Sequence, residues 1–336
     1  KPTPWLTERH GYDPTLFLIL AICLCGLAIA EDKPTYFINP KTVAYNYWAV
    51  AREGAERAGE ELDVNVIFNA PDTSDSALQI AMISDMITAG GIDGIAISPN
   101  DGSAIASVIE DALNAGINTI TWDSDATGSS RAWFVAAASQ AALGEAFAES
   151  CARQLNGEGQ VVLMVAGLGA ENQIIQKDAC VNYLSANYPN IEVVDILASN
   201  DEASQSYANA QNILAAYPDV DGIIGFAGNE IPAFAEVFTE YVEAGKYAAG
   251  DIVITGFGLP GTCKEYIKSG IVEETIAWDP GMLGYTAVYI LDEMHKGTDI
   301  STLTEVPGNC ALTIEDGCVY IGTITVNAEN VDTFDF

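Results

Sequence analysis

The sequence predicts an α/β fold, with two doubly wound parallel-sheet lobes joined by a multi-strand hinge. From residue 35 onward, short apolar runs alternate with segments of helical periodicity, which is the pattern of a mostly parallel sheet covered by helices. The run that starts at Ile117 is rich in β-branched residues and ends abruptly at Trp122 and Asp123, as a buried strand of such a sheet does. The same alternation begins again after residue 138, so the chain contains two similar α/β halves.

Each element follows from its own pattern. In the first half, apolar runs predict strands at 36–38, 64–68, 94–97 and 117–122, and apolar positions at helical spacing predict helices at 48–62, 76–89 and 103–115. In the second half, the same criteria predict strands at 161–165, 192–197, 222–226, 252–256 and 272–277, and helices at 141–155, 173–188, 205–217, 232–244, 261–269 and 282–296. The tail is predicted to form a hairpin about Asp316-Gly317 and a strand at 323–326.

The order of these elements suggests that the chain crosses between the lobes more than once. We expect the first lobe to contain 31–134 and 280–308, and the second to contain 135–279 and 309–336. The linkers are predicted near 134–139, 277–280 and 305–310.

The charge of the chain restricts its partners. It has 13 Lys and Arg against 47 Asp and Glu among its 336 residues, for a formal net charge of -34. Such a field repels phosphate backbones and anionic lipid headgroups, so nucleic acid and membrane surfaces are not expected as partners.

Residues 1–30 resemble a secretory signal. Lys1, Arg9 and His10 precede an uncharged apolar run at 16–30, which closes in Ala28-Ile29-Ala30. Fifteen apolar residues are short for a membrane span, which needs about twenty. We therefore expect an exported, periplasmic protein. A membrane tether through this segment, with Cys23 as a lipidation site, is the alternative.

The cysteines outside this segment number five. Cys310 and Cys318 flank the predicted hairpin and are a disulfide candidate in an exported protein. Cys151 and Cys180, on two predicted helices, are a second candidate pair. The chain has only two histidines, His10 and His295, which are too few for a typical zinc site or a histidine-based triad. No metal and no catalytic residue is therefore predicted.

Polar and aromatic side chains recur where the predicted strands end. In parallel sheets, ligands bind in the crevice beyond these carboxyl ends. The candidates are Lys41, Tyr45, Asn46, Tyr47, Trp48, Asn100, Asp101, Asp123, Asp125, Asn172, Gln173, Asn229, Trp278 and Asp279. Amides and carboxylates hydrogen-bond to hydroxyls, and aromatic rings stack on apolar C–H faces, so this set suits a small neutral sugar or polyol. Taken singly, each residue also has a structural explanation as a helix cap or a core side chain.

Two patterns suggest an enzyme instead. Residues 256–261 match G-x-G-x-x-G between a predicted strand and a helix, which would suit a dinucleotide such as NAD. Asp123 and Asp125 could act as the acid and base of a sugar-processing enzyme, but carboxylates two residues apart on a strand point to opposite faces. An exported NAD-dependent or sugar-processing enzyme is therefore the alternative to a binding protein, and no cofactor is expected.

Several segments together resemble the periplasmic sugar-binding proteins of bacterial ABC importers, which have the type I fold. The resemblance is strongest to the autoinducer-2-binding and rhamnose-binding branch. It covers nearly everything after Lys33 and rests on INPK (38–41), TWDSD (121–125), YPDVDGIIGFAGNEIPA (217–233), ITGFGLP (254–260), SGIVEETIAWD (269–279) and VNAENVDTFDF (326–336).

The resemblance implies a set of ligand contacts. Lys41 and Asp123 match the lysine and first aspartate that hold the cyclic polyol in the autoinducer-2 binders. Their Asp-Gln pair becomes Asn172-Gln173, and their proline and alanine positions become Phe226 and Gly228. These differences favour another sugar, such as a deoxyhexose or a pentose, over autoinducer-2.

The resemblance also implies a mechanism. A hinge closes over the ligand, and a membrane permease recognises the closed form. We expect a monomer that captures a sugar without changing it. The effector half of a LacI-like repressor shares this fold, but a signal-like segment stands where its DNA-binding helices would be.

Overall fold

The computed structural model describes Lys1 and residues 33–167, 169–308, 310–334 and 336. It divides into a short unit, Lys1–Lys33, and a compact unit, Pro34–Phe336. Apart from Lys1, the signal-like segment lies outside the described residues. None of the helices described is long and apolar enough to span a bilayer.

In the described part of the compact unit, seven strands form the first sheet, in the spatial order β13-β14-β5-β4-β3-β1-β2. They are β1 (Thr35–Asn39), β2 (Asn65–Phe68), β3 (Gly94–Ile97), β4 (Asn118–Trp122), β5 (Phe134–Ala136), β13 (Thr313–Glu315) and β14 (Cys318–Tyr320). Neighbouring strands are parallel except for the β13–β14 hairpin, in which Glu315 pairs with Cys318.

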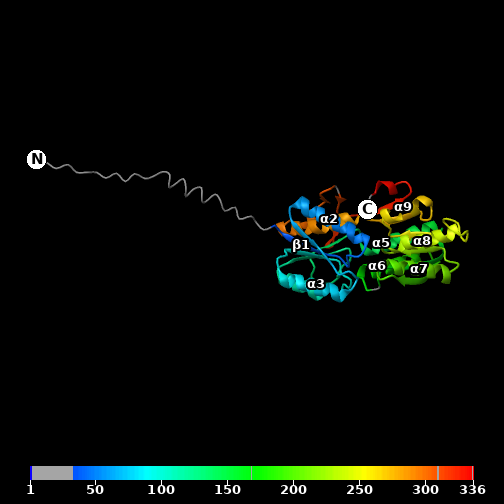
Figure 1. Cartoon of the computed structure of the whole chain (residues 1–336), viewed down its shortest axis with the longest axis horizontal. Coiled ribbons are helices and arrows are strands. Elements are labelled where there is room, and N and C mark those ends of the chain that lie inside the picture. The colour runs from blue at the N-terminus through cyan, green and yellow to red at the C-terminus, as the bar shows by residue number, and fades with distance from the viewer. Residues whose placement is uncertain (2–32, 168, 309, 335) are drawn as a thin grey trace. The chain divides into compact units, whose positions relative to one another are not determined.

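Helices cover both faces of the first sheet. One face carries α2 (Asn46–Leu62) and α10 (Pro280–Lys296), and the other carries α3 (Ser76–Ala89) and α4 (Ala106–Asn114). Successive side chains of a strand point to opposite faces. Accordingly, Tyr36 and Ile38 of β1 belong to the core beneath α2, whereas Phe37 belongs to the core beneath α3. Figure 1 shows α2 and α3 on opposite sides of β1.

The second sheet repeats this plan, as the sequence predicts. Its order is β7-β6-β8-β9, with all pairs parallel. The strands are β6 (Glu158–Val165), β7 (Asn190–Ala198), β8 (Gly222–Gly225) and β9 (Val253–Gly256). One face carries α5 (Gln140–Gln154) and α6 (Glu171–Asn187), and the other carries α7 (Ala203–Ala216), α8 (Glu230–Glu243) and α9 (Pro260–Ser269). Next to β9, β10 (Glu274–Ala277) makes a parallel bridge and pairs with β15 (Ile324–Asn327).

The chain passes between the two sheets after β5, after β10 and after β14. The prediction placed 309–336 in the second lobe, but β13 and β14 lie in the first sheet, and β5 lies where a linker was predicted. The hairpin turn was recognisable from Asp316-Gly317, but its place beside β5 was not, because strand pairing is a long-range choice. The short pair β11 (Glu305–Val306) and β12 (Cys310–Ala311) precedes this hairpin.

The predicted Cys310–Cys318 disulfide is wrong. Cys310 pairs with Val306 across β11 and β12, whereas Cys318 lies in the other hairpin, and the five cysteines of the described residues are free. Cys151 and Cys180 are fully buried and likewise unbonded, and burial raises the pKa of Cys151 to about 12.

Glycine allows the helices nearest the strand ends to pack in direct contact. A Cβ atom on Gly54 of α2 would lie 1.8 Å from the carbonyl oxygen of Gly281 in α10, and a Cβ on Gly284 would lie 2.1 Å from that of Ala51. This close approach brings Tyr47, at the start of α2, beside Trp278, which lies just before α10.

Candidate functional site

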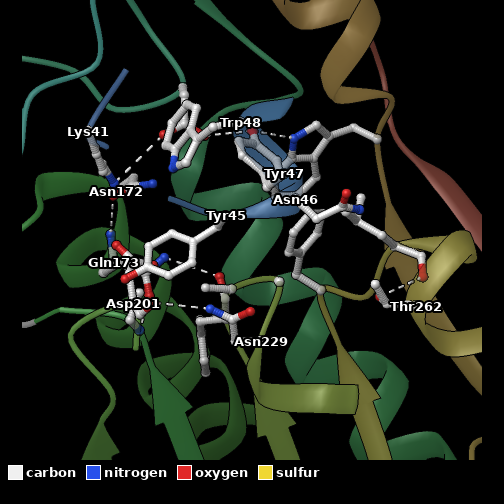
Figure 2. Close-up of a pocket in the computed structure, with 18 of the residues that line it drawn as sticks. Lys41, Tyr45, Asn46, Tyr47, Trp48, Asn172, Gln173, Asp201, Asn229 and Thr262 are labelled. Atoms are coloured by element: carbon white, nitrogen blue, oxygen red, sulfur yellow. Dashed lines mark hydrogen bonds and ion pairs between the residues drawn. The ribbon is translucent and has the colours of Figure 1, made fainter. Parts of the chain in front are cut away.

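A pocket lies at the carboxyl ends of both sheets. In the first sheet, the strand order changes direction between β1 and β3, and in the second between β6 and β8. Such switch points are where open α/β sheets bind ligands, because the loops that follow neighbouring strands diverge there. We call this the inter-sheet pocket. Its lining comes from loops and helix starts that follow strands of both sheets (Figure 2).

Twelve of the residues singled out from the sequence line this pocket. They are Lys41, Tyr45, Asn46, Tyr47, Trp48, Asp123, Asn172, Gln173, Phe226, Gly228, Asn229 and Trp278. The structure adds seven residues that were not singled out: Ala166, Gln176, Asp201, Ala227, Phe257, Leu259 and Thr262.

Asp123 directly follows β4 and has a left-handed backbone, with φ at 61°. Aspartate is one of the few residues that visit this conformation routinely. Its Oδ1 accepts a hydrogen bond from the Tyr47 hydroxyl at 2.8 Å, and its Oδ2 accepts one from Ser98 Oγ at 3.0 Å. Lys41 Nζ lies 3.7 Å from the same Oδ2. The carboxylate is thus fixed by groups from three separate segments before any ligand arrives.

Lys41 joins the two sheets. It follows β1, and its buried ammonium donates a hydrogen bond of 3.0 Å to Oδ1 of Asn172, at the start of α6. Among the described lining residues it is the one cationic side chain, and it is already shared between an amide and the Asp123 carboxylate. An anionic ligand would need more uncommitted positive charge than this, so the electrostatics favour a neutral one.

Aromatic rings form one wall. Phe257 and Trp278 stack with ring centroids 3.9 Å apart, and Tyr47 meets Phe257 edge-on at 5.9 Å. Trp278 Nε1 donates to the Tyr47 hydroxyl at 3.0 Å, and that hydroxyl donates in turn to Asp123. Burial and the neighbouring Asp123 carboxylate raise the pKa of Tyr47 well above its usual value, so the phenol keeps its proton for this bond.

Gln173 holds strand ends of the second sheet. Its Oε1 accepts from the backbone N–H of Ala166, just after β6, and its Nε2 donates to the carbonyl of Phe226, just after β8. One hydrogen of its amide remains for another acceptor.

Asp201 carries a second carboxylate into the pocket. It follows β7, has φ at 60°, and accepts a hydrogen bond from Ser74 of the first sheet's loops at 3.2 Å. Burial raises its pKa, an effect that Lys41 partly opposes. Its backbone carbonyl accepts from Asn229 Nδ2. Because β7 was predicted correctly, the loop after it could have been searched for site residues in the same way as the others.

Asp125 and Asp279, two predicted ligand contacts, are not among the residues that line the pocket. Asp125 accepts a bidentate pair from Arg131, at 2.9 Å to Nε and 2.6 Å to Nη2, and a further hydrogen bond from Thr121 Oγ1. Asp279 accepts from the backbone N–H of Met282 and caps α10. Their position at strand ends was predicted, but each side chain is committed to holding a loop or a helix.

The glycine motif at 256–261 is explained by packing. A Cβ on Gly256 would lie 2.1 Å from the carbonyl oxygen of Gly225, and one on Gly258 would lie 2.7 Å from Thr275. At the start of α9, the N–H of Gly261 donates to the carbonyl of Phe336 at 2.7 Å. The amide that a dinucleotide phosphate would use is therefore already occupied, and the NAD-dependent alternative is not supported.

Comparison with known proteins agrees with this geometry. Residues 35–299 match the family model described as periplasmic binding protein domain. The ribose import binding protein RbsB of Salmonella typhimurium is 25% identical over 289 residues, which make up 85% of this chain and 93% of that protein.

Solved structures share the fold of this chain. LsrB from Clostridium saccharobutylicum, in complex with AI-2, has a TM-score of 0.81 at 22% identity, covering 90% of this chain and 100% of that one. An ABC transporter solute binding protein from Clostridium phytofermentas with bound L-rhamnose has a TM-score of 0.80 at 25% identity, covering 90% and 98%.

Proposed function

The chain belongs to the periplasmic binding protein domain family, and from that premise we propose that it captures a small neutral sugar or a similar polyol in the inter-sheet pocket and delivers it to an ABC permease. The single observation that supports this most is the lining of the pocket. Carboxylates, amides and an aromatic wall converge there from both sheets, and the one ammonium among the described lining residues is already paired.

The ligand class follows from hydrogen bonding. Asp123 and Asp201 accept from hydroxyls, and the stacked Phe257 and Trp278 offer a flat apolar surface for the C–H face of a sugar ring. Asn172, where autoinducer-2 binders have a carboxylate, is neutral and bound to Lys41. We therefore favour a pentose or a deoxyhexose over autoinducer-2. The relatives' names, with ribose and L-rhamnose, lie within this class.

Delivery depends on movement of two lobes, one around each sheet. The contacts that join the two sheets' loops and helices include Lys41 to Asn172, Ser74 to Asp201, and the backbone N–H of Thr127 to Glu171 Oε2 at 3.0 Å. In our proposal these contacts belong to the closed form, and the three chain crossings act as the hinge. The protein works outside the cytoplasm as a monomer, without nucleic acid, cofactor or catalytic step.

Thermal-shift measurements with D-ribose, D-arabinose, L-rhamnose, D-allose and NAD test the proposal. A ligand that binds only the folded state stabilises it by about 2.7 kcal/mol at a hundredfold excess over its dissociation constant. We expect a rise in melting temperature with at least one sugar and none with NAD. A shift with NAD and no shift with any sugar would reverse the conclusion.

A further inference from the structure

Glu171 joins the two lobes at a point outside the inter-sheet pocket. It is the first residue of α6 in the second lobe, and its Oε2 accepts a hydrogen bond of 3.0 Å from the backbone N–H of Thr127 in the first lobe. A Cβ atom on Gly102 of the first lobe would lie 2.7 Å from the same oxygen and 2.8 Å from the carbonyl oxygen of Asp125. The Glu171 carboxylate therefore lies in a notch of the first lobe, formed by Gly102 and the backbone at 125–127.

This contact is separate from the ligand contacts. Glu171, Gly102 and Thr127 are not among the residues that line the pocket. Lys41 also joins the two lobes, through Asn172, but both of these residues line the pocket, so a substitution of either changes the lining as well. Glu171 can therefore affect a bound sugar only through the position of the lobes.

We propose that Glu171 is a latch of the closed form, which raises the affinity of the inter-sheet pocket by the same factor for every sugar. This inference rests on the proposed function and deepens it, because it assigns a positioning residue to lobe closure. A sugar enclosed by two lobes leaves only after they separate, so a hydrogen bond that exists only in the closed form opposes its release. The apparent dissociation constant is the intrinsic one divided by the populated fraction of the competent form, whichever sugar is bound.

The donor of the latch can be removed by a substitution that its turn accommodates. The N–H of Ser129 donates to the carbonyl of Ala126 at 3.0 Å, and Gly128 has φ at 83°. Thr127 is not among the described residues with a positive φ. These features are those of a type II turn with Thr127 at its second position, where proline is common. Thr127→Pro therefore removes the N–H donor and suits the backbone of this loop.

The acceptor of the latch can be separated from the charge of Glu171. A carboxylate at the start of α6 also stabilises the helix through the helix dipole, and every neutral substitution loses that effect. Glu171→Gln is neutral but keeps an oxygen of the same reach, whereas Glu171→Asn is neutral and shorter by one methylene group. A difference between these two variants measures the hydrogen bond to Thr127 and not the charge.

The test is titration calorimetry of D-ribose, D-arabinose, L-rhamnose and D-allose with wild type and these variants. We expect Glu171→Asn and Thr127→Pro each to bind about fivefold more weakly every sugar that wild type binds, because one hydrogen bond of the closed form is lost. Glu171→Gln should stay within about twofold of wild type, since its amide oxygen still accepts from Thr127. The double variant Glu171→Asn with Thr127→Pro should bind no more weakly than either single variant, because both remove the same contact. In stopped-flow measurements of tryptophan fluorescence, Glu171→Asn should release the sugar about fivefold faster, with the association rate unchanged.

Glu145→Asn is the matched control. Glu145 is an exposed carboxyl on α5 of the same lobe, and this variant should bind as wild type does. Wild-type affinity in a folded Glu171→Asn, additive losses in the double variant, or a loss that differs between sugars would overturn the inference and leave the proposed function intact. Failure of wild type to bind any of the sugars would overturn both. If proline at position 127 prevents folding, the comparison at position 171 decides alone, and equal losses for Glu171→Gln and Glu171→Asn would overturn the latch.

Discussion

Glu230 gives the sharpest prediction about stability. It is the first residue of α8, next to Asn229 of the pocket, and its side chain is 0% exposed. Oε1 accepts from Ser199 Oγ at 2.7 Å, while Oε2 is buried without a partner. Burial raises the pKa of Glu230 from 4.5 to about 7, and the nearby Asp201 adds to the shift.

The direction in which pH changes the free energy of unfolding follows from proton linkage. A raised pKa means that the folded state holds the proton more tightly than the unfolded state does, so folding is penalised wherever the unfolded carboxyl is ionised. The penalty is absent below the unfolded pKa of 4.5, grows as pH rises, and is complete above about 7. A difference of about 2.5 pKa units corresponds to a penalty of about 3 kcal/mol. Glu230→Gln is neutral at every pH and keeps an acceptor for Ser199, so it should remove this penalty.

The assay is urea denaturation at pH 5, 6, 7 and 8 at constant salt. We expect the free energy of unfolding of Glu230→Gln to exceed that of wild type by little at pH 5 and by about 3 kcal/mol at pH 8. Glu236→Gln, an exposed carboxyl on the same helix, should follow the wild-type curve. A Glu230→Gln advantage that stays constant across this pH range would refute the reasoning, because the group would then not titrate differently on folding.

Three further substitutions test the site and the fold. Asp123→Ala should abolish the sugar-dependent thermal shift, whereas Asp111→Ala, an exposed carboxyl on α4, should retain it; an undiminished shift would remove Asp123 from the site. Lys41→Met should weaken sugar binding less than Asp123→Ala does, as measured by calorimetry, because the loss of Asp123 also leaves the Tyr47 and Ser98 hydroxyls without their acceptor; a larger loss for Lys41→Met would contradict this. Gly54→Ala should lower the free energy of unfolding by about 3 kcal/mol, since a Cβ there meets the α10 backbone, and urea denaturation against the exposed Glu53→Ala measures it.

The sequence alone was sufficient to predict which residues follow the ends of strands. Lys41, Asp123 and Asn172 follow predicted strands, and parallel strands bring their carboxyl ends to one edge, so these residues could be assigned to a common region without coordinates. It was not sufficient for the direction of each side chain. Asp125 also follows a predicted strand, but its carboxylate turns to Arg131, an arrangement that depends on the path of the intervening loop.

Long-range pairing limited the prediction in the same way. The β13–β14 hairpin was marked by its turn, but nothing local places it beside β5. The disulfide failed for this reason, because Cys310 and Cys318 are close in sequence and belong to different hairpins. Tyr45 of the pocket was recognised as a strand-end residue. Asp201 and Phe257 follow the predicted strands at 192–197 and 252–256, so the same rule could have found them.

Several polar groups of the pocket already have hydrogen-bond partners in the protein, and this affects how the pocket selects a ligand. Asp123, Lys41 and Gln173 are hydrogen-bonded to the protein itself, so an arriving sugar replaces few missing bonds and finds its contacts already ordered. Ordered groups reduce the entropy cost of binding, which favours affinity. Discrimination then needs an atom whose partner only the correct ligand supplies.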